Sequence, residues 1–189
     1  MVGTLDRERT YEAWLVLRWQ NGDVDAFEKL VARFERPLFY YLMRLVQDEP
    51  SAWDVLQEVW LEVFRKLKKL KEPAAFRVWL YRVAHDRAVT RVRREVRREE
   101  TDEVYEELAD LDVRPGEEFE VFEDAEQVHA CLNRLRPAHR EVLTLYFLEG
   151  MGYEEIAEVV GAGVGTVKSR LHYAKKEVRR LIEESGGHA

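Results

Sequence analysis

A stretch near the C-terminus combines small residues and a glycine at the spacing of a helix-turn-helix. The sequence GYEEIAEVVGAGVGTVKSRL spans residues 152–171. Ala157 is small enough for a second helix to cross the first, and Gly161 tolerates the positive φ that the turn needs. Val167 would fix the second helix against the first, with Ile156, Val160 and Leu171 completing a small core. The spacing therefore predicts a helix pair able to enter the major groove of DNA, and an ordinary helical hairpin is the alternative.

Exposed side chains at the start of the second helix would carry the chemistry of base reading. Lysine and arginine suit the acceptor atoms of guanine, and serine and threonine suit either base type. Cations further along the same helix could lie on phosphates. The predicted DNA contacts of this helix are Thr166, Lys168, Ser169, Arg170, His172, Tyr173 and Lys175.

A second candidate surface lies within residues 65–94, where aromatic residues alternate with cations. Aromatic rings can stack on unpaired bases while neighbouring cations follow the phosphates. Trp79 and Leu80 are expected in the core, and the alternative for the whole stretch is a core of aromatics beside a solvated face of arginines. The predicted contacts with unpaired DNA are Lys68, Lys69, Lys71, Phe76, Arg77, Tyr81 and His85.

The charge of the chain is unevenly distributed, although its formal sum is −7. Residues 65–98 hold 13 basic and 3 acidic side chains, whereas residues 99–126 hold 1 basic and 14 acidic ones. A polyanion responds to the local field rather than to the sum over the chain, so nucleic-acid binding is not excluded. The acidic segment predicts a linker, and a shield over the basic block in the free protein is the functional alternative.

Composition excludes several other classes. The N-terminus lacks the apolar core of a secretory signal, and no apolar run is long enough to span a membrane, so a cytoplasmic protein is expected. Cys131 is the single cysteine, which excludes an intrachain disulfide. His129, Cys131 and His139 lack the usual spacing of zinc ligands, so neither a metal nor a cofactor is expected. No catalytic motif is present, and an enzyme is not expected.

The periodicity of apolar residues is helical almost throughout, which predicts an all-α protein of two small domains. Residues 1–98 would form a bundle of three to four helices, with helices over 24–47, 51–70 and 74–94. Pro37 predicts a kink or break near Glu35–Arg36. The acidic linker would cover residues 99–123. Residues 124–189 would form the second domain, with helices over 125–135, 137–148, 153–160 and 164–184.

Four blocks of the sequence resemble the extracytoplasmic-function sigma factors of bacterial RNA polymerase. In order along the chain they are GDVDAF (22–27), WDVLQEVWLEVF (53–64), FRVWLYRVAHDRAVTRVRR (76–94) and LNRLRPAHREVLTLYFLEGMGYEEIAEVVGAGVGTVKSRL (132–171). The resemblance implies a factor that binds core RNA polymerase, recognises two promoter elements and opens the DNA. An anti-sigma protein is a usual partner of this family.

The resemblance also implies roles for individual residues. The first domain would contact the β′ clamp through Asp54, Gln57, Glu58 and Leu61, although Leu61 could instead pack in the core. The basic block would read and melt the minus-ten element, where Asp86 stands in place of a frequent asparagine. The second domain would read the minus-thirty-five element and contact the β flap.

Two other functions remain open from the sequence. A stand-alone helix-turn-helix regulator would explain the C-terminal motif, but it has no need of the basic-aromatic block. A nucleic-acid enzyme would need acidic metal ligands on a buried face, and the clustered acids at 99–126 read as solvated.

Overall fold

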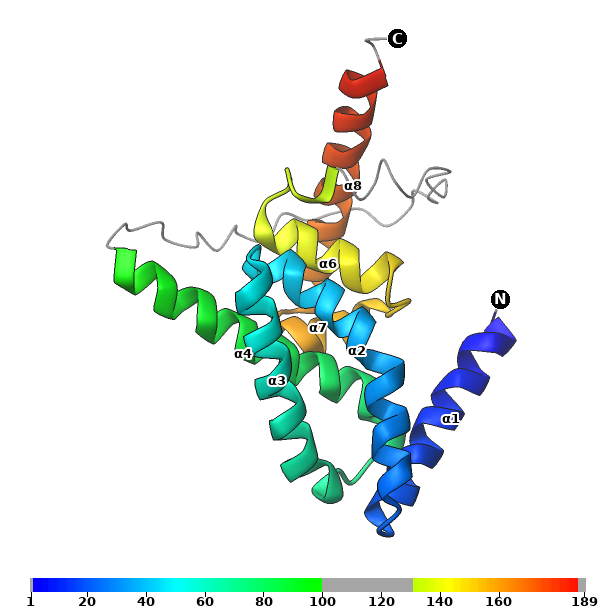
Figure 1. Ribbon diagram of the computed structural model, residues 1–189. Helices are drawn as coiled ribbons and strands as arrows, with labels where there is room; N and C mark the ends of the chain where they lie inside the picture. The colour runs from blue at the N-terminus through cyan, green and yellow to red at the C-terminus, as the bar shows by residue number, and fades with distance from the viewer. Residues whose placement is uncertain (1, 100–130, 187–189) are drawn as a thin grey trace. The chain divides into compact units, whose positions relative to one another are not determined.

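The chain divides into two compact units, Met1–Asp102 and Glu103–Ala189. The computed structural model describes residues 2–99 and 131–186 of them. Every regular element in these ranges is helical (Figure 1), which confirms the predicted all-α class. The expected linker and most of the expected helix over 125–135 lie outside the described residues, so the predicted domain boundaries stay predictions.

The first unit is a helical bundle whose elements begin where the sequence places helix-starting residues. The side chain of Asp48 accepts a hydrogen bond from the Ser51 amide at 2.9 Å, and Pro50 occupies the first turn of the helix that follows. Pro73 starts a short 3-10 turn ahead of the fourth helix. The elements are α1 (Val2–Gln20), α2 (Val24–Val46), α3 (Glu49–Lys66), 3-10 turns at Leu67–Lys69 and Pro73–Ala75, and α4 (Phe76–Glu99).

The core of this unit is built from the apolar faces of α2, α3 and α4. Of the expected kink or break near Glu35–Arg36, the break is wrong, because α2 remains helical through Pro37, and the kink stays a prediction. Buried residues on both sides of the proline, including Phe34 and Leu38, hold the two halves in the same core, which compensates for the lost backbone hydrogen bond.

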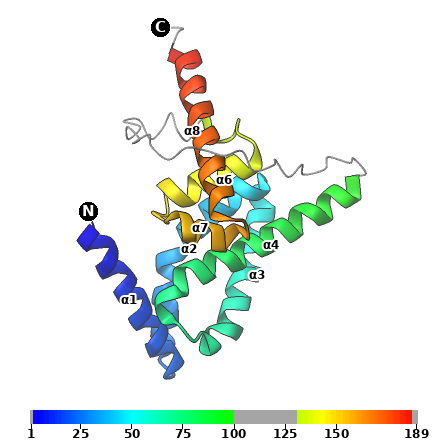
Figure 2. The same ribbon diagram turned by 180° about the vertical axis from the view of Figure 1, so that it is seen from behind.

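Helix α1 is an element that the sequence did not predict. It buries Leu15, Val16 and Trp19 against the bundle, together with the carboxylate of Glu12. In both views the α1–α2 turn and the α3–α4 connection lie at the same end of the bundle (Figures 1 and 2). The side-chain amide of Gln20 donates to the carbonyl of Leu70 at 2.8 Å and so joins these two connections.

The second unit contains three described helices, α6 (Pro137–Phe147), α7 (Tyr153–Val160) and α8 (Val164–Gly186). Helices α6 and α7 both pack on the long helix α8. Pro137 stands in the first turn of α6, as expected from the sequence. The buried apolar face of α8 runs from Val167 to Leu181, and exposed residues such as Lys168, Lys176 and Arg179 lie off this face.

Candidate nucleic-acid and polymerase interface

Helices α7 and α8 form the predicted helix-turn-helix. Gly161 ends α7 with a φ of 64°, a left-handed conformation that favours glycine. Ala157 and Val167 are buried where the two helices meet. One detail of the predicted core is wrong: Val159 is buried and Val160 is partly exposed, because the face of α7 defined by Ile156 continues three residues on.

The first turns of α8 present a mixed polar surface to solvent. Lys168 and Tyr173 are exposed, and the other predicted reading residues are partly exposed. The Lys168 ammonium lies 5.6 Å from the centre of the Tyr153 ring, so the first residue of α7 contacts this cation of α8. The partly exposed residues are Thr166, Ser169, Arg170 and His172.

Lys175 does not belong to this surface, which corrects the sequence prediction. Its residue exposure is only 3%, and burial lowers its pKa to about 8. The ammonium lies 4.5 Å from the centre of the Tyr146 ring and 5.2 Å from that of Phe147. The cation therefore contacts the aromatic end of α6 instead of facing a phosphate.

In the first unit, the lysine-rich connection between α3 and α4 is accessible. Lys68, Lys69 and Lys71 are exposed. The Lys68 ammonium lies 5.3 Å from the centre of the Trp19 ring, so α1 supports one end of this connection. Together these lysines form a local concentration of positive charge that suits phosphate.

Phe76 and Tyr81 do not present their rings to solvent, so their predicted stacking on bases is wrong for this structure. Both residues are fully buried. The Phe76 ring packs edge-on against Phe34 at 5.6 Å between centroids, and Tyr81 packs likewise against Tyr41 at 5.2 Å. They form the core between α2 and α4, as the alternative reading of this block allowed.

Arg77 is partly exposed and pairs with a buried carboxylate of the bundle. Its Nη2 donates to Glu12 Oε1 at 2.6 Å and its Nε to Oε2 at 3.2 Å. Arg33 Nε reaches the same carboxylate at 2.9 Å. Glu12 is 2% exposed, so this is a buried carboxylate satisfied by two guanidinium groups from α2 and α4. The Arg77 guanidinium is thus engaged within the bundle, and its predicted contact with DNA stays a prediction.

Two further residues of α4 lie closer to solvent. Asp86 is exposed, and Arg82 approaches its carboxylate within 3.9 Å one turn earlier on the helix. His85 is partly exposed. The exposed members of the predicted minus-ten set are thus the three loop lysines and Asp86, whereas His85 and Arg77 are partly exposed.

The predicted polymerase contacts lie together on α3. Asp54, Gln57, Glu58 and Leu61 are all exposed, and they follow one another at helical spacing. Leu61 is 57% exposed, which rules out core packing for its side chain. Leu61 is therefore accessible to a partner protein, with carboxylates and an amide beside it on the same helix.

Ion pairs join this face of α3 to α4. Arg87 Nε donates to Glu62 Oε2 at 2.7 Å, and its Nη1 approaches Glu58 at 3.4 Å. Arg91 Nη1 lies 3.6 Å from Asp54. Burial acts to raise the pKa of Glu62, but hydrogen bonds from Lys66 and Arg87 overcome it and lower the pKa. The same contact raises the pKa of Arg87.

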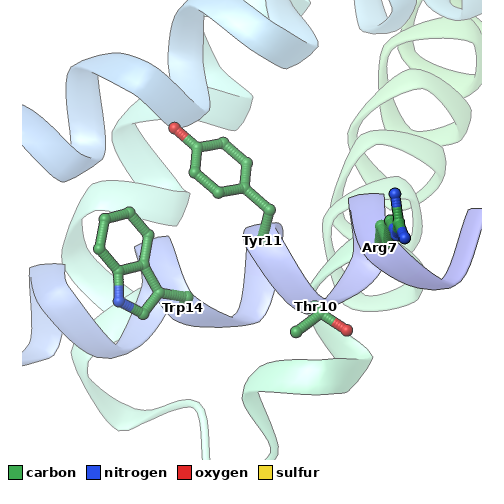
Figure 3. A pocket seen from close by; sticks show the side chains of 4 residues that line it. All are labelled: Arg7, Thr10, Tyr11 and Trp14. Carbon is green, nitrogen blue, oxygen red and sulfur yellow. The ribbon is translucent and has the colours of Figure 1, made fainter. Parts of the chain in front are cut away.

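An exposed apolar face on α1 was also missed by the sequence reasoning. Tyr11, Trp14 and Leu17 are each more than two-fifths exposed. The rings of Tyr11 and Trp14 stack at 5.6 Å, and Arg18 lies over the Trp14 ring at 4.7 Å. Figure 3 shows Tyr11 and Trp14 on one side of α1, where with Arg7 and Thr10 they line a shallow hollow. The three-residue spacing of these large residues was the available signal.

Within the described ranges, no helix is both long enough and apolar enough to cross a bilayer.

Two family models match the chain, Sigma-70 region 2 over residues 30–98 and Sigma-70 region 4 over residues 125–178. The two matches fall on the two units that carry the surfaces described above.

Curated relatives cover nearly the whole chain. The RNA polymerase sigma-H factor of Pseudomonas aeruginosa is 32% identical over 178 residues, covering 89% of this chain and 92% of the relative. The ECF RNA polymerase sigma-E factor of Escherichia coli is 30% identical over 194 residues, covering 93% of this chain and 96% of the relative.

Solved structures share the fold at lower identity. CnrH, in complex with the cytosolic domain of CnrY, superposes with a TM-score of 0.65 at 24% identity over 92% of this chain and 98% of that one. The sigma factor RpoE of Bartonella quintana, in complex with the anti-sigma factor NepR, gives 0.66 at 21% identity over 85% of this chain and 98% of that one. With both regions matched and relatives aligned along most of their length, the chain belongs to the extracytoplasmic-function family of RNA polymerase sigma factors.

Proposed function

We infer that separate surfaces of the two units bind the polymerase and the two promoter elements. The chain is a transcription initiation factor: it binds core RNA polymerase, recognises the minus-thirty-five and minus-ten elements, and promotes opening of the DNA. The residue assignments that follow are our proposal.

The observation that carries the proposal is the exposed start of α8 beside the helix-turn-helix turn. The N-terminal turns of α8, the second helix of the motif, suit the major groove. They carry Thr166, Lys168, Ser169, Arg170, His172 and Tyr173. We assign these residues to the minus-thirty-five element. Lys168 and Arg170 can donate to guanine acceptors, and the hydroxyl groups can serve either base type.

For the minus-ten element we assign the loop lysines Lys68, Lys69 and Lys71, with His85 and Asp86 on α4. The lysines supply charge for the phosphates of the separated strand. Asp86 places a negative charge on the same helix, and a carboxylate can accept a hydrogen bond from the amino group of cytosine. Because Phe76 and Tyr81 are buried, their contribution is to the core that positions α4.

For polymerase binding we assign the exposed face of α3 that includes Asp54, Gln57, Glu58 and Leu61. A leucine surrounded by polar groups gives an apolar anchor with a hydrophilic rim. The carboxylates suit cations on the polymerase. The β′ clamp is the proposed partner of this face, and the β flap that of the second unit.

Further assignments concern partners and setting. The solved relatives above are complexes with an anti-sigma factor or with a second cytosolic protein domain, and this supports a protein regulator for the present chain. We propose that the chain acts on the cytoplasmic polymerase and has no catalytic activity of its own, since its contribution to DNA opening is binding energy.

Run-off transcription with purified core polymerase tests the function. Initiation from a library of promoter fragments should depend on the added protein. Replacement of Leu61 by aspartate should reduce core binding, because a charge replaces the apolar anchor, and the folded content seen by circular dichroism should persist because Leu61 is exposed. Footprints on duplex DNA with the protein alone, and no initiation with core, would instead identify a stand-alone regulator.

A further inference from the structure

Three carboxylates and two arginines form a ladder between α3 and α4. Asp54, Glu58 and Glu62 recur every fourth residue on α3, and Arg87 and Arg91 are spaced likewise on α4. Arg87 spans Glu62 and Glu58, whereas Arg91 contacts Asp54 and donates to Ser51 Oγ at 3.0 Å. The ladder therefore joins the proposed polymerase face to the most basic helix of the chain.

The contacts of this ladder differ in strength. The Glu62 side chain is 15% exposed and holds Arg87 at 2.7 Å. The Glu58 and Asp54 side chains are 49% and 62% exposed, and their contacts with Arg87 and Arg91 are 3.4 and 3.6 Å long. Exposed ion pairs of this kind contribute about 0.2–1 kcal/mol each. The Arg87–Glu58 and Arg91–Asp54 pairs can therefore exchange partners at little cost, while the Arg87–Glu62 pair holds α4 on α3.

We propose that Asp54 and Glu58 have alternative partners: α4 arginines in the free protein and cationic side chains of RNA polymerase in the complex. Exchange releases Nη1 of Arg91 and Nη1 of Arg87 for DNA phosphates, while Arg91 keeps its hydrogen bond to Ser51. Glu62 is the positioning residue that keeps Arg87 on α3 throughout. The inference rests on the proposed polymerase face of α3, and it makes polymerase binding and DNA binding mutually reinforcing.

The free protein gives the first test. The full chain with Asp54→Asn and Glu58→Gln mimics the released state, because neutral side chains no longer pair with the arginines. The matched control is Asp25→Asn with Glu28→Gln, which removes the same charge from exposed positions on α2. Affinity for a labelled single-stranded oligonucleotide is measured by fluorescence anisotropy at low salt. We expect the α3 variant to bind about twofold to tenfold more tightly than the control. Equal affinities of the two variants would overturn the inference.

Core polymerase gives the second test. The same two variants are titrated against purified core polymerase, with thermal unfolding measured to confirm that both are folded. We expect weaker core binding only for the α3 variant. Loss of core binding with no gain in DNA affinity would leave the polymerase face in place and overturn the exchange. A gain in DNA affinity with undiminished core binding would overturn both the face and polymerase as the trigger.

Discussion

The ammonium of Lys175 lies 4.5 Å from the centre of the Tyr146 ring, so a cation of α8 is buried under the aromatic end of α6. This contact fixes α8 against the helix that precedes the helix-turn-helix. Burial disfavours the charged amine, which lowers the pKa of Lys175 from an ordinary value near 10.5 to about 8.

This burial predicts a pH dependence of stability. Between about pH 8 and 10.5 the unfolded chain retains the Lys175 proton that the folded chain has released, so the free energy of unfolding should rise with pH. Lys175→Met should remove about 1–3 kcal/mol of that rise. Denaturant titrations at pH 7.5 and pH 10 measure it, with exposed Lys176→Met as the control. Parallel pH slopes for wild type and Lys175→Met would contradict the prediction.

The buried carboxylate of Glu12 predicts a contrast between two acids on α1. Glu12→Ala leaves Arg33 and Arg77 without their shared partner and should destabilise the protein by about 3–5 kcal/mol. Glu8 also contacts Arg33, at 3.2 Å, but its side chain is 43% exposed, so Glu8→Ala should cost less than about 1 kcal/mol. Urea unfolding measures both values, and similar losses for the two variants would show that burial of Glu12 is unimportant.

Lys168 is expected to determine sequence preference within the minus-thirty-five element. Lys168→Ala should relax discrimination at one base position by about 1–3 kcal/mol, because a base-edge donor is lost. Arg179→Ala, an exposed change further along α8, should weaken all promoters alike. Transcription from promoters with single-base changes separates the two. A Lys168→Ala profile parallel to that of wild type would remove this residue from the reading surface.

Substitutions of the lysines between α3 and α4 and of the buried Tyr81 should have different effects, the first on promoter opening and the second on stability. Replacing Lys68, Lys69 and Lys71 by alanine should lower promoter opening and reduce its salt dependence, with little change in melting temperature, because these side chains are exposed. Tyr81→Ala should destabilise the first unit by about 3–5 kcal/mol, because a fully buried ring is lost. Permanganate reactivity of promoter thymines and thermal unfolding distinguish the effects. Normal stability of Tyr81→Ala would contradict its place in the core.

Glu62 predicts acid sensitivity of the α3–α4 contact. Its pKa is lowered in the folded state, so its contribution to stability is present above the pKa of the unfolded chain and is lost as pH falls through the folded pKa. Glu62→Gln should lower stability by about 1 kcal/mol near neutral pH and flatten the acid side of the profile. Glu58→Gln, with its longer and more exposed contact, should change the profile less. Identical acid profiles for wild type and Glu62→Gln would refute this role.

Local signals in the sequence were enough for most helix positions. Pro50, Pro73 and Pro137 each stand at a helix start, and Gly161 ends α7 with the left-handed φ that the motif requires. The exposure of the α3 face also follows from the period of its apolar residues. These features depend on residues close in sequence, so the pattern was sufficient to find them.

The failures depend on contacts between distant residues. Helix α1 escaped detection because Tyr11, Trp14 and Leu17 are apolar on the face opposite its buried residues, which removes the contrast that marks an amphipathic helix. The burial of Lys175 requires Tyr146 of α6, far from it in sequence. An aromatic residue beside a cation can equally stack on a base or pack in a core. The core position of Tyr81 follows only from its packing against Tyr41.

The position of Glu12 bears on any attempt to exchange regions between relatives. The Sigma-70 region 2 match begins at residue 30, after α1 has ended. A chimera built on that boundary would inherit Arg33 and Arg77 but take its first helix from another protein. Unless the donor helix supplied a carboxylate at the same place, the two guanidinium groups would lose the anion that they share. In this chain the first folded unit therefore begins with the helix that precedes the family match, and an exchange should keep that helix.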